Sequence, residues 1–130
     1  MELTKEMVNM VEQGDSKALA TYTKGCLHVV PVSTARVDNN KIILVNYFMG
    51  KTLANIRENS NVSFACWIGL EGYQIKANVA YITEGELFDS VTQWVGDILP
   101  ERVVKGVLEL TPYEVYDVSA TATHPGERVL

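Results

Sequence analysis

Residues 46–56 of the chain read NYFMGKTLANI. The stretch follows an apolar run that ends at Val45, breaks at Gly50, and resumes with Leu53 and Ile56 on one face of a helix. A strand that leads into a helix beginning Lys51-Thr52 brings a cation, a hydroxyl group and free backbone N–H groups to the positive end of the helix dipole. We therefore interpret the start of this helix as an anion site, in which Lys51 and Thr52 hold a phosphate.

The main rival interpretation is a P-loop, because Gly50-Lys51-Thr52 matches the last three residues of that motif. A P-loop also needs a glycine five residues before Gly50, where a flexible backbone wraps the phosphates. That position is Val45, inside the predicted strand, so the sequence argues against a nucleotide hydrolase. From Gly-Lys-Thr alone, an ordinary helix start with a solvated lysine remains an alternative.

Composition and charge limit the classes of protein that fit. The chain has 130 residues, of which 47% are hydrophobic and 21% charged, which suits a single globular domain over residues 1–130. The net charge is -5, and Lys and Arg form no basic stripe, so we predict no nucleic-acid partner. Any phosphate must then be held by local groups.

We expect no membrane segment and no signal peptide, and hence a cytoplasmic protein, because the apolar runs are shorter than a bilayer span. Cys26 and Cys66 are too few for a disulfide scaffold, and each lies in an apolar, strand-like setting. Cys26, His28 and Cys66 could supply metal ligands, but no second close pair completes a zinc site. We predict no metal site.

The pattern along the chain predicts a β-rich α+β protein. Helical spacing or capping signals mark residues 4–13, 51–58 and 84–99. Strand signals mark residues 18–23, 27–37, 41–47, 62–68, 73–83, 103–110 and 114–118, with a turn at Asp38-Asn39-Asn40 and a polar tail from Ala120. Antiparallel strands with short helices between them favour a small barrel or a curved sheet, since closure removes exposed edges.

Three motifs, taken in order, resemble the pyridoxamine 5′-phosphate oxidase-like FMN-binding split-barrel family. They are His28-Val29-Val30-Pro31-Val32, the strand before Gly50-Lys51-Thr52-x-x-Asn55-Ile56, and Gly72-Tyr73-Gln74-Ile75-Lys76. Within that family the chain is most similar to the small single-domain FMN-binding proteins. The resemblance implies a six-stranded antiparallel split β-barrel with short peripheral helices, and a homodimer with FMN at the subunit interface.

The resemblance also implies which residues bind the cofactor. Lys51 and Thr52 would hold the FMN phosphate, with Asn55 one turn further along the same helix edge. Backbone groups beside the flavin ring would come from Pro31, Val32, Ser33 and Thr34, and the strand beneath the cofactor would contribute Val45, Asn46 and Tyr47. Gln74 and Lys76 would reach the phosphate or the ribityl chain.

The chain departs from the family in two places. Many relatives have glycine after the Gln-x-Lys unit, where this chain has Ala77. The arginine and histidine residues with which longer members hold the substrate pyridine have no counterpart in the short tail. We therefore do not predict pyridoxamine oxidation.

The chemistry expected of this site is that of the flavin, positioned and tuned by backbone N–H groups and apolar walls. We assign no catalytic residue, because no side chain needs to act as an acid or base. The first hypothesis is a flavin-dependent oxidoreductase that uses a nicotinamide-type or other small donor and a small acceptor. The second is a non-enzymatic electron carrier or FMN store; a third is a site for another phosphorylated ring such as pyridoxal phosphate. Haem is disfavoured because no axial ligand pair stands out.

Overall fold

The computed structural model describes residues 1–130, which form three helices and eight strands. The helices are α1 (Lys5–Gln13), α2 (Lys51–Glu58) and α3 (Glu86–Ile98). The strands are β1 (Ser16–Thr23), β2 (Cys26–Pro31), β3 (Ala35–Asp38), β4 (Lys41–Asn46), β5 (Asn61–Ile68), β6 (Glu71–Ile82), β7 (Gly106–Asp117) and β8 (Glu127–Arg128). No helix is long and apolar enough to cross a membrane.

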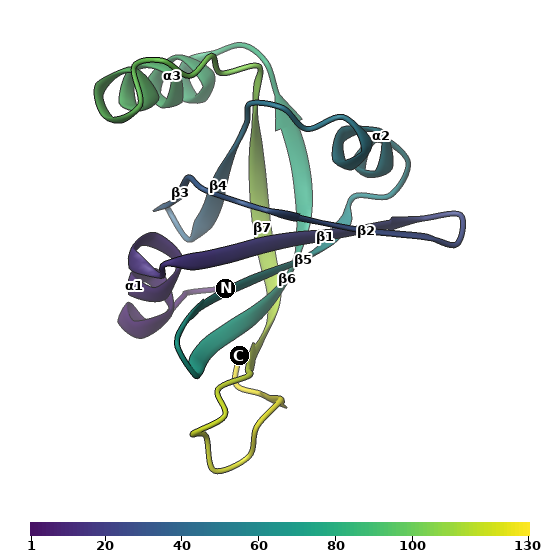
Figure 1. Cartoon of the computed structure of the whole chain (residues 1–130), viewed down its shortest axis with the longest axis vertical. Helices are drawn as coiled ribbons and strands as arrows, with labels where there is room; N and C mark the ends of the chain where they lie inside the picture. Colours follow the sequence, from purple (N-terminus) through teal and green to yellow (C-terminus); the bar gives the residue numbers. More distant parts are fainter.

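All strands belong to one antiparallel sheet with the order β2-β1-β5-β6-β7-β4-β3, and β8 pairs with β7 (Figure 1). The path runs from β2 to β3, two strands that are consecutive in sequence yet lie at opposite ends of the sheet. The sheet curls around a core that includes Leu19, Phe64, Ile75 and Leu108, which α1 covers with Met7 and Val11. The β-rich α+β split-barrel fold is confirmed.

The structure has eight strands, not the six that the resemblance implies or the seven that the sequence pattern marks, and two local features add strands to that pattern. The run predicted as one strand over residues 27–37 is interrupted after Pro31, where residues 32–34 leave the sheet before β3 begins. Pro31 has no N–H to continue a ladder, and the chain there crosses from one end of the sheet to the other. In addition, part of the polar tail, where no strand was predicted, forms β8.

The two strands predicted over residues 103–110 and 114–118 are a single strand, β7. Its pairing with β6 shifts register at Lys76 and Ala77, which face Glu114 and Pro112, so Tyr113 has no opposite residue. Such a bulge accommodates Pro112, which cannot donate to the ladder, without ending the strand. Pro112, which lies between the two predicted strands, therefore marks a bulge within β7 and not the end of a strand.

Strand β4 is buried on both faces, which explains its continuous apolar run. Ile42 and Leu44 point into the core of the barrel, whereas Ile43 and Val45 pack on its outer side against Val91 and Val95 of α3. In Figure 1, α3 lies apart from the barrel core, beside the upper ends of the long strands β6 and β7. The predicted hairpin turn before β4 is confirmed, with Asn39 and Asn40 in the left-handed region that asparagine tolerates.

Candidate functional site

The main groove of the molecule lies where β2 approaches the connection between β4 and α2. Its volume is about 580 Å³, within the roughly 300–1,000 Å³ typical of small-molecule and cofactor sites. It is lined by His28, Val30, Pro31, Val32, Ser33, Val45, Tyr47, Phe48, Met49, Gly50, Lys51, Thr52 and Arg102. The sequence stretch 46–56 and the strand 28–32 are therefore neighbours in space, as the resemblance implies.

The start of α2 opens onto this groove and has no internal cap. Gly50 precedes the helix and offers no side chain to its free N–H groups. Thr52 is fully buried, and its Oγ1 is the one buried side-chain polar atom of the chain without a hydrogen-bond partner. Lys51 is exposed and takes part in none of the ion pairs. The residues present therefore fit a phosphate group, which would satisfy these donors together.

The segment between β2 and β3 forms one wall of the groove. Val32 donates its N–H to the carbonyl of Lys17 at 3.0 Å, whereas Ser33 and Thr34 donate to no backbone carbonyl of the chain. Thr34 is buried just below the wall, with its Oγ1 at 3.0 Å from the Tyr47 hydroxyl. Ser33 therefore offers the groove a backbone N–H group with no partner in the chain, whereas Thr34, predicted as a site residue, does not line the groove.

The structure does not place Asn46 or Asn55 on the groove, although both lie in elements that build it. Asn46 donates through Nδ2 to the Tyr81 hydroxyl at 2.8 Å and accepts at Oδ1 from the Met49 N–H at 2.7 Å. Asn55 donates through Nδ2 to Thr21 Oγ1 at 2.9 Å, in a buried bond between α2 and β1. Both side chains hold the loop and the helix in position.

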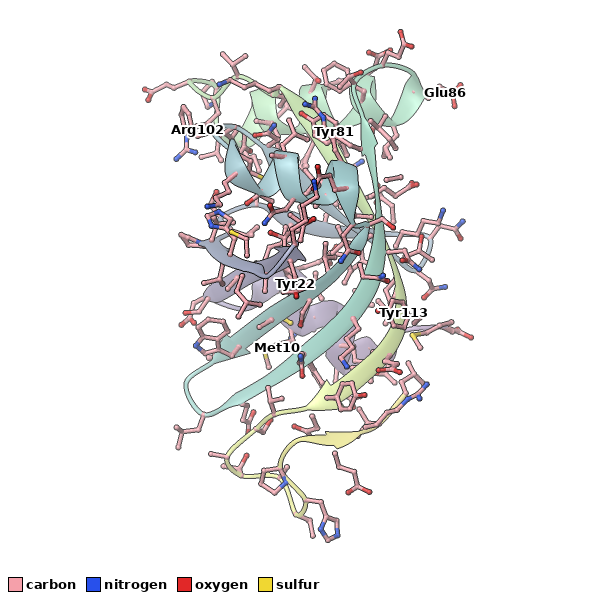
Figure 2. All side chains as sticks on the ribbon, turned by 90° about the vertical axis from the view of Figure 1, so that its right-hand side faces the viewer. Met10, Tyr22, Tyr81, Glu86, Arg102 and Tyr113 are labelled. Carbon is pink, nitrogen blue, oxygen red and sulfur yellow. The ribbon has the colours of Figure 1, made fainter.

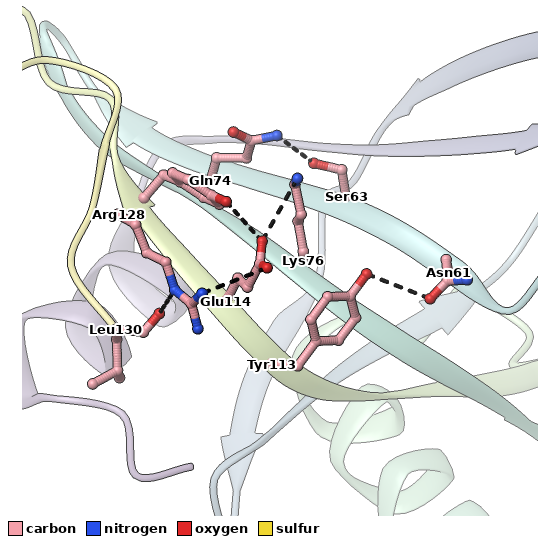
Figure 3. A network of polar contacts seen from close by, with 9 residues as sticks. Asn61, Ser63, Gln74, Lys76, Tyr113, Glu114, Arg128 and Leu130 are labelled. Carbon is pink, nitrogen blue, oxygen red and sulfur yellow. Dashed lines mark hydrogen bonds and ion pairs between the residues drawn. The ribbon is translucent and has the colours of Figure 1, made fainter.

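Gln74 and Lys76 lie on β6, on the outer face of the sheet and away from the groove of their own chain (Figure 3). Gln74 Nε2 donates to Ser63 Oγ at 3.0 Å, and Lys76 Nζ lies 3.6 Å from a carboxylate oxygen of Glu114. The Tyr116 hydroxyl donates to Glu114, and this bond, helped by Lys76 and Arg128, lowers the pKa of that carboxyl. The same bond raises the pKa of Tyr116.

Sequence reasoning missed six of the lining residues: His28, Val30, Phe48, Met49, Gly50 and Arg102. His28 and Val30 alternate with the exposed Leu27 and Val29 along β2, and that two-residue period could have placed them on one face. Arg102 follows α3, far from the other lining residues in sequence. No local motif could have assigned it to the groove.

The groove is basic although the protein as a whole is acidic. His28, Lys51 and Arg102 are its ionisable side chains apart from the Tyr47 phenol, and no Asp or Glu lines it. The net charge of the chain is -5. A basic groove on an acidic protein favours an anionic ligand.

The two cysteines lie outside the groove. Cys66 is buried on β5, and burial raises the pKa of its thiol to about 11, which keeps it neutral. Burial likewise raises the pKa of the Tyr73 phenol on β6, with Asp117 adding to the effect. Cys66 thus behaves as an apolar core residue of the barrel.

Comparison with known proteins supports the same family. A sequence model of the pyridoxamine 5′-phosphate oxidase family matches residues 3–119. A protein of Methanocaldococcus jannaschii described as "Uncharacterized protein MJ0282" is 27% identical over 125 residues, covering 92% of this chain and 83% of that protein. The chain belongs to the pyridoxamine 5′-phosphate oxidase family.

Solved structures share the fold at lower sequence identity. The crystal structure of HupZ from Group A Streptococcus superposes with a TM-score of 0.82 at 22% identity, covering 95% of this chain and 99% of that one. An FMN-binding protein from Syntrophomonas wolfei superposes with a TM-score of 0.76 at 18% identity, covering 91% and 90%. These similarities establish the fold, and the site is argued from this chain's own residues.

Proposed function

We propose that the protein binds FMN in the groove between β2 and α2, with the phosphate at the start of α2. The observation that carries the proposal is the orphaned Oγ1 of the fully buried Thr52, beside the unpaired Lys51 and an uncapped helix start. A buried hydroxyl without a partner is costly, and a phosphate oxygen would accept its hydrogen bond. The match to a flavin-binding family and the FMN-binding protein of Syntrophomonas wolfei support FMN as the phosphate-bearing ligand.

The remaining walls suit the ring of a flavin. Val30, Val32 and Val45 offer apolar surface, and the N–H group of Ser33, which lines the groove and donates to no backbone carbonyl, is free to donate to the ring edge. Bound flavin supplies hydride or electron transfer, while the protein orients the ring and limits its contact with water. Tyr47 is held by its hydrogen bond to Thr34 and fixes one side of the groove.

From this we propose a flavin-dependent oxidoreductase that acts on a small-molecule or nicotinamide-type donor. The groove is open to small molecules at a rim that carries Phe48, whose side chain is 80% exposed. The alternative is a non-enzymatic electron carrier or flavin store, which needs the FMN site alone and no substrate-binding residue.

We further propose that a second copy of the chain covers the outer face of β1, β2 and β5. Leu27, Val29, Tyr22 and Trp67 are exposed there, and the strand register places them on one side of the sheet with small residues such as Ala18 and Ala65. An uncovered apolar sheet face of this kind marks an interaction surface. Gln74 and Lys76 belong to the same face, so in a symmetric dimer they could serve the cofactor of the partner.

Absorption spectroscopy of the purified protein tests the cofactor assignment. We expect flavin bands and release of FMN on denaturation, or tight binding when FMN is titrated into protein that lost it. Pyridoxal phosphate serves as the competing ligand in the same titration. Failure to bind FMN at micromolar concentrations would overturn the proposal.

Anaerobic mixing with NADH or NADPH then separates the two functions. Rapid and saturable loss of the flavin bands identifies an oxidoreductase, whereas a carrier is reduced slowly and without saturation.

Light scattering at micromolar concentration tests the dimer, and a monomer would contradict it. The substitution Val29→Lys should convert a dimer to monomers, because it places a charge on the covered face.

A further inference from the structure

The rim of the groove carries a second cation that the proposed phosphate grip does not use. Arg102 lies on the groove, is exposed, and its side chain makes no hydrogen bond or ion pair. Figure 2 shows it at the margin of the molecule, in the half that carries α3. An exposed arginine is common, but one that lines a groove with no Asp or Glu among its lining residues is available to a ligand.

The Arg102 side chain is held in place without being neutralised. Its guanidinium carbon is 5.0 Å from the ring centroid of Tyr47 and 5.7 Å from that of Phe48. The segment is anchored by two backbone bonds of 3.0 Å, from Arg102 to Leu99 and from Lys105 to Asn46. Stacking on aromatic faces orients a guanidinium and leaves its N–H groups free to donate.

The charge of the groove exceeds what one phosphate monoester needs. Such a group carries about -1.5 to -2 near neutral pH, and Lys51 together with roughly half a positive charge at the start of α2 supplies most of the balance. The positive charge of Arg102 then remains on the same groove, where no Asp or Glu lies among the lining residues. A single bound FMN therefore leaves the site electrostatically complementary to a second anion.

We propose that Arg102 is a specificity residue that selects an anionic substrate, a small molecule bearing a carboxylate or phosphate, over neutral ones. The inference rests on the proposed FMN site and names the substrate class for it. Arg102 acts by a charge-assisted hydrogen bond to the anionic group of a molecule that enters past Phe48. It does not contribute to FMN affinity.

Two electron acceptors of different charge test this inference on protein loaded with FMN and reduced anaerobically by light, with EDTA as the electron donor. Ferricyanide is a trianion, and two such ions each take one electron from the reduced flavin, whose protons pass to water. The other acceptor, p-benzoquinone, is neutral and takes two electrons and two protons. The quantity measured is the ratio of the second-order oxidation rate constants for the two acceptors. In Arg102→Gln we expect this ratio to fall about fivefold or more at low salt, because electrostatic attraction of anions is lost.

Three controls define the outcome. Arg102→Lys should retain most of the ratio, and Arg57→Gln, which removes an exposed charge from α2 outside the groove, should leave it unchanged. The Kd for FMN should change less than about twofold in Arg102→Gln, against a large loss in Lys51→Gln. An unchanged ratio, or an FMN loss matching that of Lys51→Gln, would overturn the inference. If the wild-type protein binds no FMN, both the proposed function and this inference are wrong.

Discussion

Helices α1 and α2 both begin near a threonine, and the two starts are built differently. At α1, Thr4 is the N-cap, and its Oγ1 accepts from the Met7 N–H at 3.2 Å. At α2, the preceding residue is Gly50, no side chain caps the helix, and Thr52 is buried with an unpartnered Oγ1. A side chain of α1 satisfies one of that helix's free donors, whereas no side chain does so at α2, whose start lies on the groove.

The start of α1 therefore contributes to the stability of the protein, whereas the start of α2 is suited to binding a ligand. A capped helix start contributes to folding, because the cap side chain satisfies one of the free N–H groups of the first turn. An uncapped start with a buried orphan hydroxyl lowers the stability of the empty protein and gains a partner only when an anion binds. Substitutions at the two starts should therefore affect different measurements.

The largest effect is expected for Lys51→Ala combined with Thr52→Ala. The double variant loses one charge-assisted and one neutral hydrogen bond to the FMN phosphate, about 2–4 kcal/mol, or roughly 30- to 1,000-fold in Kd. Fluorescence quenching of FMN measures the Kd. An unchanged affinity would refute the assignment of the phosphate to this helix.

The substitution Thr52→Val tests the comparison more closely, because it keeps the shape of the side chain and replaces the hydroxyl with a methyl group. In the empty protein the free energy of unfolding should rise by about 1 kcal/mol, since a buried unsatisfied group is lost, while FMN binding weakens about tenfold. Denaturant titration and FMN titration measure the two effects. Their opposite signs distinguish a ligand-binding threonine from a structural one.

Thr21→Val is the matched control, because Thr21 is equally buried but accepts a hydrogen bond from Asn55 at 2.9 Å. This substitution should lower the free energy of unfolding by about 1–2 kcal/mol, since it orphans the Asn55 amide. If both variants change stability in the same direction, Thr52 is not an orphan in solution.

The smallest effect is expected at the capped helix. Thr4→Ala should lower the free energy of unfolding by about 1 kcal/mol through loss of the cap, and leave the Kd for FMN unchanged. Denaturant titration measures the first quantity and fluorescence quenching the second. A weaker FMN affinity in this variant would show that the two helix starts are coupled, contrary to the comparison.

Local sequence signals predicted the elements that build the site better than they predicted the sheet. The bounds of α2 agree with its predicted range, and α3 differs by no more than two residues at either end, because spacing of apolar residues and flanking Gly or Pro mark helices clearly. Pro31 and Pro112 were harder to interpret. The first accompanies a break between β2 and β3, and the second sits in a bulge of β7.

The predicted site residues divide in the same way. Residues adjacent in sequence to the glycine break, such as Tyr47, Lys51 and Thr52, lie on the groove. Gln74 and Lys76 face the other side of the sheet, and their proposed role in FMN binding depends on a partner chain. Arg102 was not predicted, because it reaches the groove through the packing of α3 and the loop that follows.

By itself, the sequence determined the strand, the glycine and the helix start that present Lys51 and Thr52, because these depend on propensities and spacings within a dozen residues. It also determined the apolar run of β4. Only the tertiary structure decided that Thr52 has no partner, that Asn55 has one, and that Arg102 shares the groove with Lys51. Hydrogen-bond satisfaction and the sum of charges around a cavity depend on segments far apart in the chain, which meet only when the sheet closes around its core.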